Sequence, residues 1–306
     1  MKTIQMCAVM TAMLVAAAGA GAQQMQSYDA ATSGAPTVLV TVHEFVQPGA
    51  EAAHARLEHD YANVLDAGKG EQFYLGLGSV SGSPRAVFLS GYSSMAEMAE
   101  VHTHDYEKMG DRLSEIDEAH ADTVRDVDTT IWRLRPDLST SGTVNMAQMR
   151  YAELVEVHVK VGYAAEFDQI SQHIKEGWAK ADPNFQYSVY EENFGNSTDD
   201  AYMVVIAMKS LGDLDKHHDM VAQYRSALGD ETHKKMIAME REAYDGVESN
   251  LLVFAPSMSR LPEGWTKYDT EYWKPKPTSP APMKKKTPTA AKAAAPAATK
   301  APTATK

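Results

Sequence analysis

The chain is poor in cysteine, and its central part is poor in basic residues. The only cysteine, Cys7, lies within the first 22 residues. The rest of the chain therefore forms no disulfide and depends on an apolar core. The full chain has 29 basic and 41 acidic residues, and without its first 22 residues and residues 265–306 it keeps 19 and 39, a net charge near −20. Such an acidic body repels nucleic acid and anionic lipid, so neither is an expected partner of that body.

Several sequence signatures of known chemistry are also missing. There is no H-E-x-x-H, no C-x-x-C, no EF-hand loop and no G-x-S-x-G elbow, so we expect no metal site and no serine nucleophile of these kinds. Possible ligand stretches do occur, at His102-x-His104 and His217-His218-Asp219. Residues two apart on a helix point about 200° from each other, so neither stretch predicts a chelate. No cofactor is expected, and a haem, if bound, would take His102 or His218 as a single axial ligand.

The first 22 residues have the pattern of a secretory signal peptide. Lys2 supplies a positive start, an apolar stretch follows, and Ala20-Gly21-Ala22 forms a small-residue cleavage site. The apolar stretch is too short to favour a membrane span. We therefore expect an exported protein, secreted or periplasmic, whose residues 23–36 form a disordered leader.

A short strand-like stretch occurs twice in the remaining chain. Leu39-Val40-Thr41-Val42-His43 recurs 115 residues later as Leu154-Val155-Glu156-Val157-His158. In both copies valines alternate with other residues, which is typical of a β-strand. Each copy is followed by a helical pattern opening on an acidic residue, Glu51 or Glu166. The stretch predicts two copies of one structural unit.

Each copy predicts the element order βαββαβ, a ferredoxin-like unit. The first unit spans residues 37–138, with hairpin chemistry at residues 81–84 and a last strand that ends at Pro136. Its second helix is predicted to break at Gly110-Asp111. The second unit spans residues 149–258, with the corresponding break at Leu228-Gly229-Asp230. The recurrence of these landmarks favours an internal duplication.

The composition changes after the second unit. Residues 259–274 contain Trp265, Tyr268, Tyr272 and Trp273, and they either fold back onto the body or form a mobile aromatic linker. Residues 275–306 consist almost wholly of Pro, Ala, Thr, Ser and Lys, which predicts a disordered tail. Such a basic tail could act as a spacer or contact an acidic envelope polymer.

Strand parity predicts where the repeated histidines point. If Val38, Val40 and Val42 pack on the helices, then His43 faces the opposite sheet, and by the same parity so do Glu156 and His158. We predict that these three residues lie in a shared interior, where an imidazole beside a carboxylate suits general base catalysis. The alternative is that they are hydrogen-bonded residues at a barrel mouth. His102 and His218 are predicted on the apolar stripes of the second helices, close to the same interior.

The tandem order resembles the dimeric α/β-barrel superfamily, with stretches similar to its NIPSNAP-like and antibiotic-biosynthesis-monooxygenase-like branches. The resemblance rests on the turn 46–51, the run 90–98 that enters the second helix, and the strand closing at Pro136. It covers residues 37–138 and, less closely, 150–258, where Gly162-Tyr163-Ala164 replaces the Pro-Gly turn. It implies an α+β fold in which two ferredoxin-like units form an intrachain barrel with antiparallel sheets inside and helices outside. It also implies a pseudo-dimer within one chain, so that a monomer is plausible.

Three functions follow as hypotheses. The first is binding of a small apolar or aromatic molecule in the cavity between the two units. The second is a cofactor-free, monooxygenase-like oxidoreductase that uses His43, His158 and Glu156. The third is an envelope-associated interaction protein anchored by its basic tail. No catalytic motif of the superfamily is matched residue by residue, so the sequence leaves all three open.

Overall fold

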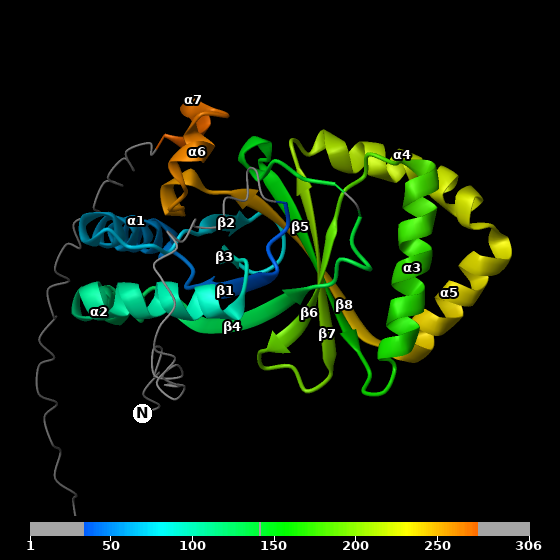
Figure 1. The fold of residues 1–306 in the computed structure, drawn as a ribbon, viewed down its shortest axis with the longest axis horizontal. Coiled ribbons are helices and arrows are strands. Elements are labelled where there is room, and N and C mark those ends of the chain that lie inside the picture. Colours follow the sequence, from blue (N-terminus) through cyan, green and yellow to red (C-terminus); the bar gives the residue numbers. More distant parts are fainter. Residues whose placement is uncertain (1–33, 141, 275–306) are drawn as a thin grey trace, which may run out of the picture.

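The computed structural model describes residues 34–140 and 142–274. The signal peptide, most of the leader and the basic tail predicted from the sequence lie outside these residues. A β-barrel forms the middle of the molecule, with one helix pair on one side and three helices on the opposite side (Figure 1). Within the described residues, no helix combines the length and the apolar character that crossing a membrane requires.

The first half of the chain has the order βαββαβ. Its elements are β1 (Val38–Val46), α1 (Glu51–Gly68), β2 (Leu75–Ser79), β3 (Arg85–Tyr92), α2 (Met95–His120) and β4 (Val124–Leu134). Ser94 begins α2, because its side chain accepts a hydrogen bond from the backbone N–H of Glu97. The two helices lie side by side on the outer face of these strands (Figure 1).

The second half has the same strand order with a divided last helix. Its elements are η1 (Met146–Gln148), β5 (Tyr151–Val159), α3 (Ala164–Ala181), β6 (Ser188–Phe194), β7 (Asp200–Met208), α4 (Gly212–Leu228), α5 (Asp230–Ala243) and β8 (Tyr244–Phe254). The eight strands close into an antiparallel barrel in the order β1-β3-β2-β8-β5-β7-β6-β4. Closure leaves no unpaired sheet edge. The predicted α+β class and barrel are confirmed, whereas the origin by duplication stays a prediction.

Alternation along β1 divides its side chains as predicted. Val38 and Val40 pack with Tyr92 and Met98 on the helix side, whereas Leu39 belongs to the cluster inside the barrel. In β5 the corresponding division places Val157 and Val159 with the helices. Both faces of β1 are buried, which explains why its first half is almost wholly apolar.

The glycine breaks differ between the two halves. Gly229 has a φ of +78°, a conformation that disfavours a side chain, and it separates α4 from α5. Gly110 lies inside the uninterrupted helix α2, so the predicted break there is wrong. A Gly-Asp pair alone does not decide between the two outcomes, because glycine is tolerated within a helix at a cost of about 1 kcal/mol.

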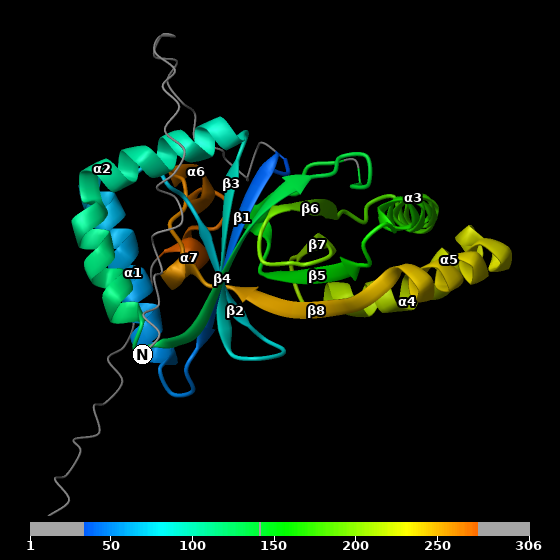
Figure 2. The ribbon, with the colours of Figure 1, turned by 90° about the horizontal axis from the view of Figure 1, so that it is seen from below.

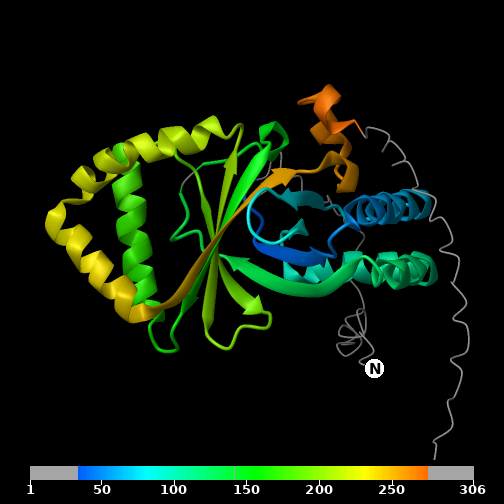
Figure 3. The ribbon, with the colours of Figure 1, turned by 180° about the vertical axis from the view of Figure 1, so that it is seen from behind.

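The aromatic segment after β8 folds back onto the barrel. It contains η2 (Pro256–Met258), α6 (Glu263–Thr266) and α7 (Thr270–Trp273), which lie beside the first half (Figures 2 and 3). Trp265 and Trp273 are 2% and 4% exposed. The Nε1 of Trp273 donates to the carbonyl of Ala147 at 2.7 Å. Of the two alternatives that the sequence left open for residues 259–274, the structure has the packed one.

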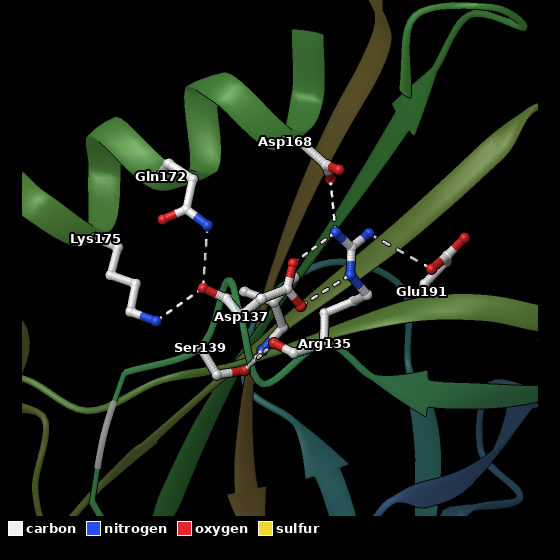
Figure 4. Close-up of polar contacts among 8 residues, drawn as sticks. Arg135, Asp137, Ser139, Asp168, Gln172, Lys175 and Glu191 are labelled. Atoms are coloured by element: carbon white, nitrogen blue, oxygen red, sulfur yellow. Dashed lines mark hydrogen bonds and ion pairs between the residues drawn. The ribbon is translucent and has the colours of Figure 1, made fainter. Parts of the chain in front are cut away.

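An arginine joins the two halves at the end of β4. The Arg135 guanidinium contacts carboxylate oxygens of Asp137 at 2.8 Å, Asp168 at 3.0 Å and Glu191 at 3.5 Å (Figure 4). Asp168 comes from α3 and Glu191 from β6, so this network ties the connection between the halves to the second one. These carboxylates, Asp137 first, raise the pKa of Arg135 above its usual value.

Candidate functional site

The middle of the barrel is filled by side chains. Residues from both halves meet there and are at most 4% exposed: Leu77, Val87, Trp132, Leu154, Met203 and Leu252. We call these six residues the waist. One member of the waist also forms a hydrogen bond: the Nε1 of Trp132 donates to the hydroxyl oxygen of Thr41 in β1 at 2.9 Å. The waist divides the interior into two ends with different chemistry.

One end holds a cavity of about 360 Å³. Leu39 near the start of β1, Leu134 at the end of β4 and Ala207 near the end of β7 contribute to its wall. Leu261 and Trp265 from the folded-back segment also line it. Small-molecule sites typically occupy roughly 300–1,000 Å³, so this cavity has room for a small ligand.

The cavity wall is mostly apolar and rich in aromatic rings. Its aromatic members are Phe73, Tyr74, Tyr92, Tyr187, Tyr190 and Trp265. The charged residues among the described lining residues are Glu71 and Glu97, and no lysine or arginine is among them. An anionic ligand would therefore meet acidic charge and no compensating cation.

Polar atoms near the cavity lack partners. The hydroxyl groups of Tyr74 and Tyr187 and the Nε1 of Trp265 are buried and have no hydrogen-bond partner in the part of the chain that the structure describes. Burying such a group without a partner costs about 1–3 kcal/mol. Burial raises the pKa of both tyrosine hydroxyls, which keeps them as neutral donors. Tyr74 and Tyr187 pack in the clusters between the strands and the helices, whereas Trp265 belongs to the cluster inside the barrel. A ligand acceptor in the cavity would therefore satisfy the Nε1 of Trp265.

The opposite end of the barrel is charged. There the Nη1 of Arg85 lies 3.4 Å from the Nδ1 of His43, and the Nδ1 of His158 lies 3.4 Å from a carboxylate oxygen of Asp199. Glu156 lies within the electrostatic reach of both Arg85 and His158. Arg85 therefore interacts with His43 and Glu156, whereas His158 has Asp199 as its ion-pair partner.

Burial alters the protonation of this end. Desolvation, assisted by the positive charge of Arg85, lowers the pKa of His43 from 6.5 to about 4. Desolvation also raises the pKa of Glu156, although Arg85 opposes that change. At neutral pH His43 is therefore a neutral imidazole, and its buried Nε2 has no partner among the described residues.

The two repeated histidines do not occupy matching places. His43 is 7% exposed, whereas the side chain of His158 is 33% exposed. A β-bulge follows Phe45 in β1, and the corresponding bulge in β5 follows His158. Alignment of the two halves by their bulges pairs His158 with Phe45. The sequence match pairs His158 with His43, so the two alignments differ by two residues. None of His43, Glu156 and His158 lines the cavity, and their predicted catalytic role stays a prediction.

The helix histidines lie away from the barrel interior. His102 is half-buried on α2 with its ring 6.2 Å from that of Tyr92, and burial lowers its pKa. His218 is exposed on α4, and its neighbour His217 packs against Phe185 instead, with ring centroids 4.3 Å apart. Neither His102 nor His218 lines the cavity. Their proposed part in haem binding stays a prediction.

The sequence did not reveal two features. The first is the position of Trp265 at one end of the barrel. The aromatic content of residues 259–274 does not indicate where on the barrel the segment packs. The second is a buried cluster that includes His54 and Glu58 of α1. Their spacing of four residues was visible as a signal, since such residues share one helix face.

Comparisons with known proteins concern the fold. No family model and no curated protein matches the chain. A solved anthrone oxidase-like protein is 13% identical, with a TM-score of 0.49 over 72% of this chain and 92% of its own. A Fusobacterium nucleatum protein described as a monooxygenase is 15% identical, with a TM-score of 0.46 over 72% and 93%. A chlorite dismutase variant from Candidatus Nitrospira defluvii is 12% identical, with a TM-score of 0.43 over 73% and 92%. Similarity at this level says nothing about chemistry.

Proposed function

We propose that the protein binds a small, uncharged aromatic molecule in the cavity beside Trp265. The observation that carries this proposal is the cavity of about 360 Å³ with six aromatic residues in its wall. Aromatic rings prefer offset-stacked or edge-to-face contacts, each worth roughly 0.5–1.5 kcal/mol beyond the buried area. A flat aromatic ligand can make several such contacts at once.

Charge and hydrogen bonding narrow the ligand further. Glu71 and Glu97 disfavour an anion. The partnerless Nε1 of Trp265 favours a ligand that carries an acceptor such as a carbonyl, ether or phenol oxygen. The proposed ligand class is therefore a neutral aromatic compound with at least one oxygen substituent.

A comparison of matched compounds tests this specificity. Thermal unfolding of the full chain is measured with 2-naphthol and with 2-naphthoate, which have the same ring system and differ in charge at neutral pH. We expect 2-naphthol to raise the Tm and 2-naphthoate to have a clearly smaller effect. Equal stabilisation by both compounds, or by neither, would contradict the proposal.

The enzyme hypothesis has one observation in its favour. His43 is a neutral, buried imidazole whose Nδ1 accepts from the guanidinium of Arg85, so its Nε2–H, which has no partner among the described residues, is free to donate to a substrate oxygen. The waist lies between this histidine and the cavity. Catalysis by His43, His158 and Glu156 would therefore act on a substrate entering the charged end. Export and the role of the basic tail remain predictions from the sequence.

A further inference from the structure

A buried polar cluster lies between the barrel and the first helix pair. It consists of Glu44, His54, Glu58 and His120, which are 7%, 1%, 4% and 2% exposed. None of these four residues lines the cavity beside Trp265. We call them the His-Glu cluster. Charged and imidazole groups are seldom buried to this extent without a strong partner.

Three elements converge to form the His-Glu cluster. Glu44 lies on the face of β1 that the valines turn toward the helices, and its carboxylate reaches His54. His54 and Glu58 are one turn apart on α1 and therefore share a helix face. His120 is the last residue of α2, which lies beside α1 (Figure 1). The fold thus directs four donor side chains to one place.

The donor atoms are close to one another. The Nε2 of His54 lies 2.6 Å from an oxygen of Glu44 and 3.8 Å from Oε1 of Glu58. The Nε2 of His120 lies 2.9 Å from the same Glu58 oxygen, but this contact lacks the geometry of a hydrogen bond. Donor atoms of His54, Glu58 and His120 all lie within 4.8 Å of one another.

The electrostatics of the cluster favour a cation. Glu44 and Glu58 are two buried carboxylates whose ion-pair partners are the imidazoles of His54 and His120. No lysine or arginine forms an ion pair with either carboxylate among the described residues. A divalent ion would neutralise both carboxylates with the imidazoles uncharged.

We propose that Glu44, His54, Glu58 and His120 bind a divalent transition metal ion of the Zn²⁺ type. Zinc binds imidazole nitrogen and carboxylate oxygen at about 2.0–2.2 Å, so neighbouring atoms of a tetrahedral site lie about 3.4 Å apart. The contacts of 2.6, 2.9 and 3.8 Å in the cluster lie on both sides of that value, so small side-chain shifts bring His54, Glu58 and His120 onto one ion. The carboxylate of Glu44, which contacts His54 but lies outside the group of donor atoms within 4.8 Å of one another, must turn further to complete the site. Mixed nitrogen and oxygen donors disfavour Ca²⁺ and Mg²⁺, which prefer oxygen alone.

The burial of all four donors indicates a closed, structural site, since catalytic zinc sites keep an open position. The ion would join β1, α1 and α2. At the two matching helix positions the second half has no imidazole and no carboxylate. The fourth and eighth residues of α1 are His54 and Glu58, and those of α3 are Phe167 and Ser171. Phe167 stacks on Tyr202 with ring centroids 3.7 Å apart.

Titration with Co²⁺, a spectroscopic substitute for Zn²⁺, tests the proposal on the full chain after treatment with a chelator. We expect one Co²⁺ per chain, with the strong visible absorption of a four-coordinate ion, displacement by Zn²⁺ and a higher Tm with either metal. Mg²⁺ should give none of these effects. Wild-type protein that binds neither Co²⁺ nor Zn²⁺ would overturn the proposal.

Variants locate the ion. Glu58→Gln and His120→Gln should each weaken Co²⁺ binding at least tenfold, whereas His59→Gln should bind as the wild type does. His59 is next to Glu58 on α1 but lies outside the cluster, so it is a matched control. Glu44→Gln is the further variant, because the amide can keep a hydrogen bond to His54 and preserve folding while the affinity falls. Unchanged binding in folded Glu44→Gln and His120→Gln proteins would place the ion elsewhere and refute the site.

Discussion

The two ends of the barrel interior share one frame and differ in chemistry. At one end Leu39, Tyr190 and Trp265 surround a mostly apolar cavity. At the other end Arg85, Glu156 and His158 form a charged group. The strands are continuous between the ends, and inward-facing positions alternate with outward-facing ones at both. Inward-facing side chains are therefore apolar or charged according to their position along the strand, because both kinds point to the same face.

The difference follows from what covers each end. Trp265 and Leu261 of the folded-back segment cover the cavity end, so apolar side chains there are kept from water. At the charged end, the side chain of His158 remains 33% exposed, and water can solvate the ionised groups. A cover made by a segment outside the barrel therefore allows one end to serve as an apolar site.

Truncating Trp265, which covers the cavity end, should have the largest effect on the difference between the two ends. Trp265→Ala is expected to lower the free energy of unfolding by about 3–5 kcal/mol, because a buried tryptophan is truncated, and to abolish binding of 2-naphthol. Urea unfolding and the thermal shift measure the two effects. Tyr268→Ala is the control in the same segment, since Tyr268 is 42% exposed and its loss should cost about 0.5 kcal/mol or less. A similar cost for both variants would show that the cover is not docked as described.

Opening the waist should have the next largest effect. Leu154→Ala removes a fully buried side chain between the two ends and should cost about 2–5 kcal/mol in urea unfolding. Leu154→Met keeps the volume and should cost less than about 1.5 kcal/mol. If Leu154→Ala costs no more than Leu154→Met, the waist is not the packed barrier that separates the ends.

The charged end should give a smaller effect that depends on pH. Because burial raises the pKa of Glu156, the folded state holds its proton to a higher pH than the unfolded state does. The ionised carboxylate therefore lowers stability as the pH rises. Glu156→Gln should raise the free energy of unfolding at pH 7.5 by about 1 kcal/mol, the usual scale of one substitution. This gain should shrink as the pH falls to about 4, which urea unfolding at several pH values measures. A gain that is the same at every pH would contradict the assignment.

The sequence predicted the frame of the protein well because alternation and helical periodicity are local properties. The valines of β1 and the opposite direction of His43 followed from parity alone. The break at Gly110 was predicted wrongly, because the sequence around a glycine does not fix its backbone conformation. The mismatch between His43 and His158 depends on where each strand bulges, which sequence similarity did not reveal.

The sites were harder to predict than the frame. Trp265 and Leu39 both line the cavity although they are 226 residues apart in the chain, and an association over that separation leaves no periodic pattern in the sequence. The His-Glu cluster joins His54 and Glu58, whose spacing was visible, to His120 on another helix. Only the packing of α1 on α2 brings the third residue into reach.

Binding of a neutral fluorescent probe tests the central claim most directly. N-Phenyl-1-naphthylamine is titrated into the wild type, into Ala207→Phe, which places a ring in the cavity, and into His158→Gln at the charged end. The cavity account predicts saturable binding to the wild type and to His158→Gln, and at least tenfold weaker binding to a folded Ala207→Phe protein. Equal affinity for Ala207→Phe and the wild type, or loss of binding only in His158→Gln, would contradict it.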